Sequence, residues 1–222
     1  SFAGFKTEEK EINLSTNLTL NFSLEETIFQ AERIIVQATR ANDKTPTTFS
    51  EMVEKEIKER NLGQDLPYML KFTPSIVTTS DAGAGVGYTG MRIRGSDATR
   101  INVTINGIPL NDSESHVTYW VDLPDFASSV NTIQIQRGVG TSTNGAGAFG
   151  ATVNLQTSLP SNEPYARLEN SYGSFNTRKY AAFFGTGPIN NRWSFEGRLS
   201  KIVSDGYIDR ASSDLKSYFL SG

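Results

Sequence analysis

The sequence predicts an α+β chain in which a small mixed β-sheet with short helices precedes the antiparallel strands of an incomplete β-barrel. Three observations lead to this prediction. Short segments with period-two alternation, separated by glycine-rich loops, occur between residues 101 and 157. Helix signals are confined to residues 48–73. After Pro164 the predicted strands lengthen and alternate between an apolar and a polar face.

Residues 1–30 are predicted to contain two strands, at 11–14 and at 18–24. In the second, Leu18, Leu20, Phe22 and Leu24 alternate with polar residues. Two strands alone are marginal in water. We therefore interpret them as the end of a small β-domain whose front precedes Ser1.

Two short helices are expected next. Thr48 and Glu51 have the spacing of a capping box, and the first helix ends at residues 61–63. Asp65 begins the second helix, and Pro74 closes it.

Strands and loops then alternate. Residues 80–90 form a glycine-rich polar loop, and residues 111–121 form a second, polar-aromatic loop. Asn106-Gly107, after the strand at 101–105, is the strongest short hairpin signal in the chain. Further strands are predicted at 91–94, around Ile133 and Ile135, and at 151–157.

The clearest strand is predicted at 192–200. Its two faces differ: Trp193, Phe195, Gly197 and Leu199 point one way, and Arg192, Ser194, Glu196, Arg198 and Ser200 point the other. A barrel strand between lipid and a polar lumen has this pattern. An antiparallel sheet packed on a soluble core would show it equally well, so both interpretations stay open.

Composition excludes several classes of function. The net charge is −3 and no basic run is present, which argues against nucleic-acid binding. The chain has no cysteine and one histidine, His116, so no metal site or catalytic dyad built on these residue types is expected. No apolar run approaches the roughly 20 residues of a spanning helix. The residues after Ser1 show no signal-peptide pattern, so either the protein is cytosolic or its front has been removed.

Residues 85–90 match the dinucleotide-binding pattern G-x-G-x-x-G. That chemistry needs a strand before the motif and a helix after it. Here a polar loop precedes it and the strand-like residues 91–94 come directly after it. We therefore interpret the motif as a loop and expect no cofactor.

Asp112, Glu114 and His116 lie close together in a loop, followed by Tyr119 and Trp120. A carboxylate-histidine catalytic site lacks a nucleophile in a recognisable context, so the chain is not expected to be an enzyme. A ligand-contact loop is the favoured interpretation. A solvated loop with one aromatic residue tucked beneath it is the alternative.

Arg94-Gly95 and Arg137-Gly138 each end a strand. A solvated arginine is usual there, but the repeated pattern suggests fixed ion pairs with another domain. Ile34-Ile35-Val36 lies in an otherwise polar segment. It suits either a core strand or the addition of a strand to a partner's sheet edge.

The order of these segments resembles the plug domain of TonB-dependent outer-membrane transporters, over residues 32–157. Residues 32–40 are similar to the family's TonB box and the residues directly after that box. The remaining similarities are Met91-Arg92-Ile93-Arg94-Gly95, the hairpin at 103–110 (with Asn106 where Asp is common), Ile133-Gln134-Ile135-Gln136-Arg137-Gly138, and residues 145–155.

The resemblance implies a division of the chain into four parts. Residues 1–30 would be the last strands of a carboxypeptidase-regulatory-like domain, and 31–47 the TonB-box segment and linker. Residues 48–160 would be the plug domain, and 161–222 the first strands of a truncated barrel of about 22 strands.

The resemblance also implies site residues. The TonB box would be Glu32, Arg33, Ile34, Ile35, Val36 and Gln37, although Arg33 and Gln37 are atypical and leave its limits open. The ligand-contact loops would supply Ser80, Asp81, Tyr88, Asp112, Glu114, His116, Tyr119 and Trp120. Arg94 and Arg137 would pair with carboxylates of the barrel wall.

The implied function is energy-coupled import across the bacterial outer membrane, with the plug and tail facing the periplasm. The partners would be TonB, the chain's own barrel, membrane lipid and a small ligand. A ferric siderophore or another iron chelate is preferred. An oligosaccharide or cobalamin receptor, or a binding module that reuses the plug fold without transport, is the alternative. No metal or cofactor is expected to be bound by the chain itself.

Overall fold

The structure is a computed structural model, and it describes residues 5, 7–13, 17, 19–24, 39–140, 142–145, 147–190 and 192–222. The chain divides into two compact units, Ser1–Ile34 and Ile35–Gly222. In the first unit, residues 7–13 and 19–24 are assigned to neither helix nor strand. The strands predicted at 11–14 and 18–24 are therefore not found in the described residues.

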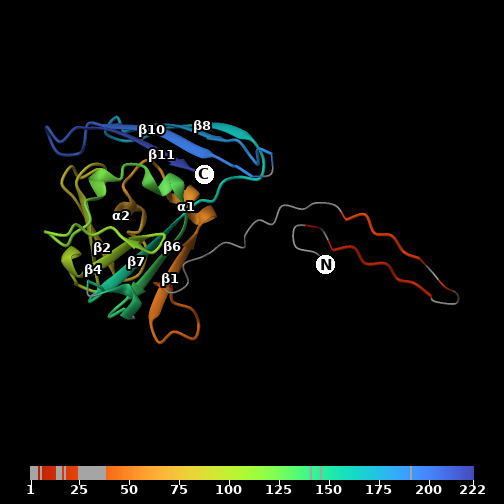
Figure 1. Cartoon of the computed structure of the whole chain (residues 1–222). Coiled ribbons are helices and arrows are strands. Elements are labelled where there is room, and N and C mark those ends of the chain that lie inside the picture. The colour runs from red at the N-terminus through yellow and green to blue at the C-terminus, as the bar shows by residue number, and fades with distance from the viewer. Residues whose placement is uncertain are drawn as a thin grey trace. The chain divides into compact units, whose positions relative to one another are not determined.

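The second unit contains a five-stranded sheet, called the central sheet below, in the order β1-β6-β7-β4-β5. Its strands are β1 (Thr48–Val53), β4 (Ile101–Ile105), β5 (Ile108–Pro109), β6 (Val130–Arg137) and β7 (Ala151–Thr157). β4 and β7 are parallel, and the other neighbours are antiparallel, so the sheet is mixed as predicted. Figure 1 shows these strands with the short helices beside them.

One face of the central sheet forms the hydrophobic core. Ile133 and Ile135 of β6 and Val153 and Leu155 of β7 are at most 2% exposed. They pack with residues of α1 (Glu54–Arg60) and α2 (Leu66–Met69), of which Ile57 and Leu66 belong to the same buried cluster. The alternation seen in the sequence thus identified the core face.

The helix predicted from Thr48 begins six residues later than expected. Residues 48–53 form β1 instead, paired with β6 from Thr48 opposite Arg137 to Val53 opposite Thr132. The capping role falls to Glu56, whose carboxylate accepts a hydrogen bond from the Val53 backbone N–H at 3.4 Å. Pairing with a distant strand outweighs the local capping signal of Thr48 and Glu51.

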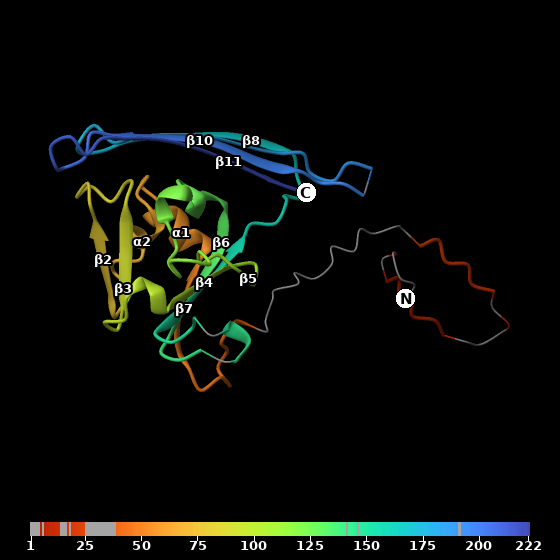
Figure 2. The same ribbon diagram turned by 60° about the vertical axis from the view of Figure 1, so that its left-hand side comes forward.

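The hairpin signal at 106–107 and the loop predicted at 80–90 are confirmed. Asn106 and Gly107 both have positive φ angles, 51° and 81°, as a two-residue hairpin between β4 and β5 requires. The predicted loop at 80–90 connects β2 (Ile76–Ser80) and β3 (Thr89–Ile93), which form a separate antiparallel pair. Figure 2 shows this hairpin beside the central sheet.

Short 3₁₀ helices fill several connections. They are η2 (Ala98–Arg100), η3 (Trp120–Asp122), η4 (Phe126–Ser129) and η5 (Ser142–Asn144). No helix in the described ranges combines the length and the apolar character that a membrane-spanning helix needs.

The last strands form a second, fully antiparallel sheet, called the C-terminal sheet, in the order β11-β10-β9-β8. The strands are β8 (Tyr165–Tyr172), β9 (Arg178–Gly185), β10 (Glu196–Ser204) and β11 (Ser213–Ser221). The strand predicted at 192–200 therefore starts later. Trp193 instead bridges to Ile189 in the preceding turn, and its ring stacks on that of Phe195.

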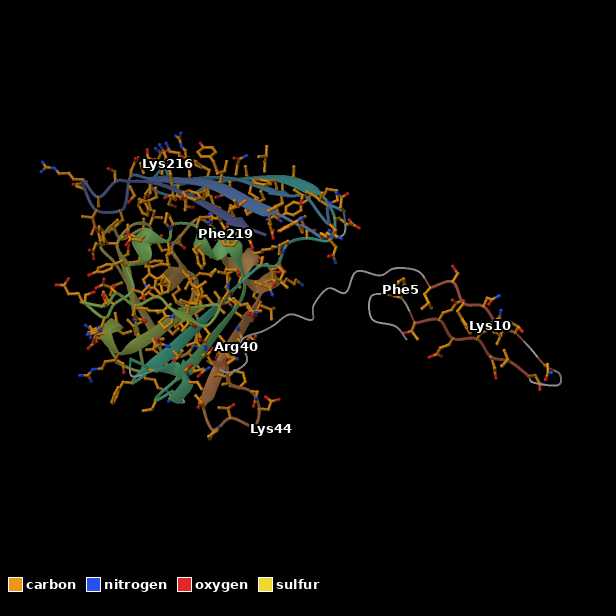
Figure 3. The ribbon with its side chains drawn as sticks, viewed as in Figure 1. Phe5, Lys10, Arg40, Lys44, Lys216 and Phe219 are labelled. Carbon is orange, nitrogen blue, oxygen red and sulfur yellow. The ribbon has the colours of Figure 1, made fainter. Side chains whose placement is uncertain are left out.

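The two faces of the C-terminal sheet have opposite character. Arg198 and Ser200 of β10 are buried, whereas Leu199 between them is 60% exposed. On β11, Lys216 and Phe219 point to opposite sides of the sheet (Figure 3). The exposed large apolar and aromatic side chains on the same face as Leu199 are Leu168, Tyr172, Tyr180, Phe184, Tyr218 and Leu220.

A buried carboxylate, Asp125 at the start of η4, pairs with two cations on the buried face of the C-terminal sheet. Lys179 of β9 lies 2.6 Å from its Oδ1, and Arg198 of β10 lies 3.1 Å from its Oδ2. Ser128 donates a third hydrogen bond at 2.6 Å. Burial alone would raise the pKa of Asp125, but Lys179 and Arg198 outweigh it and hold the pKa below its usual range.

Replacing Asp125 with Asn is expected to destabilise the fold by about 3–5 kcal/mol, because the substitution leaves two buried cations without an anion. The free energy of unfolding in urea, followed through buried Trp120, measures the effect. Asp122→Asn removes a more accessible carboxylate three residues away and is the control. Equal losses in the two variants would contradict the assignment.

Candidate ligand pocket

Four of the predicted contact residues meet around one pocket of about 260 Å³. They are Asp81, Tyr88, Tyr119 and Trp120, from two loops about 30 residues apart in sequence. Met91, Ile101 and Val103 form part of the remaining lining. Tyr88 is 64% exposed and Tyr119 47%, whereas Trp120 is buried. The pocket thus combines an apolar base with two accessible phenol groups and a carboxylate.

Residues 81–88, called the glycine loop, are held from beneath by the start of α2. The Gly85 carbonyl accepts a hydrogen bond from the Asp65 backbone N–H at 2.8 Å, and Gln64 Nε2 donates to the Ala84 carbonyl at 2.9 Å. Gly85 has φ +77°, and a Cβ there would lie 2.5 Å from the Tyr68 ring. Only glycine allows this close approach.

Asp65 is 2% exposed and supports the same loop from its interior side. Its Oδ2 accepts a hydrogen bond from the Thr89 hydroxyl at 2.9 Å, at the point where the glycine loop enters β3. Burial raises the pKa of Asp65 to about 7, and hydrogen bonds from Thr89 and the Gly87 backbone oppose that shift only in part. The carboxyl group beneath the pocket therefore titrates near neutral pH.

The glycine loop also contacts the C-terminal sheet. The Tyr207 backbone N–H, in the connection between β10 and β11, donates to the Ala82 carbonyl at 2.8 Å. Ser80, another of the predicted contact residues, accepts a hydrogen bond from the Gly85 N–H through its hydroxyl at 3.0 Å. Ser80 shapes the loop and does not line the pocket.

Asp112, Glu114 and His116 do not line the pocket either. Asp112 Oδ2 accepts hydrogen bonds from the backbone N–H groups of Glu114 and Ser115, at 3.1 and 2.7 Å. The backbone and hydroxyl hydrogen bonds from Ser115 lower the pKa of Asp112. His116 is exposed with φ 59°. Asp112 closes a tight turn near the pocket through these hydrogen bonds. A ligand-contact role for Asp112, Glu114 and His116 stays a prediction.

Arg94 and Arg137 lie at the C-terminal ends of β3 and β6. Arg137 is buried and donates to the Pro74 carbonyl at 3.1 Å and to the Ser50 hydroxyl at 2.6 Å. Burial and then the neighbouring charge of Arg94 lower the pKa of Arg137. Within the described ranges, neither arginine forms an ion pair. Their pairing with carboxylates elsewhere in a barrel stays a prediction.

Residues 32–37, the predicted TonB box, lie outside the described residues. In the part of the chain that is described, no cluster of three or more His, Asp or Glu residues has the arrangement of a metal site. Sequence reasoning missed Asp65 as a support of the glycine loop and Asp125 as the partner of two buried cations. The first was interpreted only as a helix start, and the second carries no local signal.

Comparison with known proteins supports the predicted plug fold. A family model described as TonB-dependent Receptor Plug Domain matches residues 41–152. Similar solved structures include the pyoverdine outer membrane receptor FpvA of Pseudomonas aeruginosa, with 16% identity, a TM-score of 0.62, and coverage of 79% of this chain and 25% of that one.

Two further structures are the alcaligin receptor FauA of Bordetella pertussis and the ferric-catecholate import receptor Fiu of E. coli. FauA has 21% identity and a TM-score of 0.56 over 73% of this chain and 27% of its own. Fiu has 19% identity and a TM-score of 0.55 over 72% and 22%. The chain thus spans about a quarter of the length of these proteins, and the likeness shows their fold.

The raised pKa of Asp65 predicts how stability depends on pH. The stability contributed by the neutral carboxyl is fully present below pH 4 and is lost as the pH rises through about 7. Between pH 5 and pH 8 the unfolding free energy should fall by about 2–3 kcal/mol more in the native chain than in Asp65→Asn. Urea unfolding at several pH values tests this, with Asp81→Asn on the exposed side of the loop as the control. Parallel curves for the native chain and Asp65→Asn would refute it.

Proposed function

Because the chain belongs to the TonB-dependent receptor plug domain family, we propose that it is the gating part of an outer-membrane transporter that imports a ferric siderophore or another iron chelate. The observation that carries this proposal is the pocket in which two separate loops bring together Asp81, Tyr88, Tyr119 and Trp120. Aromatic rings around an apolar base suit a bulky chelate, because they supply contact area at low entropic cost.

The proposed mechanism begins when ligand contacts both pocket loops. The glycine loop connects directly to β2 and β3, and Asp65 links it to α2. Ligand binding would shift the tail with residues 32–37 into the periplasm, where TonB adds Ile34-Ile35-Val36 to its sheet edge. Force drawn from the inner-membrane proton gradient would then loosen the plug. No covalent chemistry is part of this scheme.

The C-terminal sheet would be the first part of the barrel wall. Its exposed face, with Leu168, Leu199 and Tyr218 among its side chains, suits contact with lipid. Its buried face carries Lys179 and Arg198 toward Asp125. We propose the domain limits as 1–30 for the preceding β-domain, 31–47 for the TonB-box segment and linker, 48–160 for the plug and 161–222 for the wall.

Uptake of labelled iron chelates by iron-starved cells tests the function. Cells with the full-length gene should accumulate the chelate, and cells without it, or treated with an uncoupler, should not. Ile35→Pro should abolish uptake while ligand binding persists, because proline removes a backbone donor that strand addition requires. Ile35→Val keeps that donor and is the control.

The outcomes of this test separate the alternatives. Gene-independent iron uptake, with the plug assignment intact, would move the ligand to an oligosaccharide or cobalamin. Normal uptake by Ile35→Pro would remove the triplet from the mechanism. A protein that binds its ligand but never transports it would be a binding module that reuses the fold.

A second experiment addresses the pocket. Tyr88→Ala should weaken chelate binding about tenfold or more, since an accessible aromatic contact is lost, equivalent to about 1.4 kcal/mol. Tyr172→Ala is the matched control, because it removes another exposed tyrosine, which lies on the exposed face of the C-terminal sheet. Chelate titration of both full-length variants measures the change. Unaltered affinity in Tyr88→Ala would place the ligand elsewhere.

A further inference from the structure

The second face of the central sheet is buried but polar. Opposite the core face, β6 and β7 present Gln134, Gln136, Thr152 and Asn154, each at most 3% exposed. Buried amides need hydrogen-bond partners, since an unpaired one is costly. The partners of these amides indicate the role of this face.

Three of these amides hold the backbone of residues 39–41. The Ala41 N–H donates to Gln134 Oε1 at 2.7 Å, and Gln134 Nε2 donates back to the Ala41 carbonyl at 2.9 Å. Gln136 Nε2 and Asn154 Nδ2 both donate to the Thr39 carbonyl, at 2.7 and 2.9 Å. We call Gln134, Gln136 and Asn154 the amide latch.

The latch is fixed in position by its neighbours. Gln136 Nε2 also donates to Gln134 Oε1 at 3.0 Å, and Asn144 Nδ2 donates to Gln136 Oε1 at 3.0 Å. The Thr104 hydroxyl donates to Asn154 Oδ1 at 2.6 Å. Each amide is therefore oriented before it meets residues 39–41, and the bonds should form and break together.

All four latch bonds go to backbone atoms, so they hold the path of the chain and not its side chains. Residues 39–41 begin two positions after Gln37, the last residue of the predicted TonB box, and a short loop separates them from β1. Among the described residues β1 is an edge strand of the central sheet, where its partner is β6. Without the latch, tension on the tail would reach Thr48 directly and peel the edge strand away.

We propose that the amide latch is where tension on the N-terminal tail enters the plug, so that pulling loads the inner strands β6 and β7 before it reaches the edge strand β1. Arg40, labelled in Figure 3, lies between the two latched residues in sequence. Its guanidinium also pairs with Glu51 of β1 at 2.6 Å, but the Glu51 side chain is 39% exposed, so this contact resists tension less than the four latch bonds. This inference rests on the proposed function for the origin of the tension, but the mechanical claim concerns this chain alone.

Single-molecule pulling on the full-length transporter in vesicles, through a handle at its N-terminus, tests the latch without TonB or ligand. Gln134→Met with Gln136→Met removes three of the four backbone bonds. The force of the first rupture should fall by about half, because cooperative hydrogen bonds that resisted it are gone. The released length, residues 39–53, should be about 5 nm in both proteins.

Gln156→Met is the matched control. Gln156 lies on the same face of β7, and the bond described for it is from Thr132, away from residues 39–41. Its first rupture force should equal that of the native protein. An unchanged rupture force in the double variant would overturn the proposal, whatever the uptake assay shows.

Hydrogen exchange provides a second measurement that does not depend on the double variant folding. The Ala41 N–H is protected by Gln134 Oε1, so Gln134→Met alone should raise its exchange rate about tenfold or more while β7 amides keep theirs. Equal protection of Ala41 in the native protein and in Gln134→Met would refute the latch. If Ala41 is protected in the native protein but cells carrying the native gene do not take up iron chelates, the result contradicts the proposed function and not the latch.

Discussion

The fold depends on one buried carboxylate. Asp125 has no exposed side-chain surface, and its charge is balanced by Lys179 and Arg198 from two strands that lie more than 50 residues further along the chain. A carboxylate in such a place is costly unless its partners are present. The plug region around η4 and strands β9 and β10 of the C-terminal sheet must therefore assemble together, because neither side can bury its charges alone.

The charges of this contact are arranged in the opposite way to the predicted ion pairs. The sequence predicted that Arg94 and Arg137 of the plug pair with carboxylates of the barrel wall. The observed contact places the carboxylate in the plug and the cations in the wall strands. A sequence cannot reveal this, because Asp125 lies in a short loop that resembles any solvated turn, and its partners are identified only by the register of β9 and β10.

Features with a local cause were predictable. Asn106-Gly107 dictates a hairpin through its positive φ angles, and the alternation around Ile133 and Ile135 marks a core face. Features set by distant partners were not. The capping-box spacing of Thr48 and Glu51 gave way to pairing with β6, and Gln134 and Gln136 differ from solvated polar residues only once residues 39–41 cover them. The role of Asp65 in supporting the glycine loop likewise depends on its hydrogen bonds with Thr89 and Gly85.

Strand β6 connects the two buried polar contacts on which the plug depends. Its first residues follow η4, which Asp125 fixes to the C-terminal sheet, and its second half carries Gln134 and Gln136 of the latch. Tension that enters at residues 39–41 would pass along this strand toward a point anchored to the wall. Because β6 is held by the Asp125 ion pairs near its start and by the latch bonds in its second half, it would resist tension applied to the tail. The part of the plug that yields first must then lie outside the line between them, and both β1, at the sheet edge, and the β2–β3 hairpin that carries the glycine loop meet that condition.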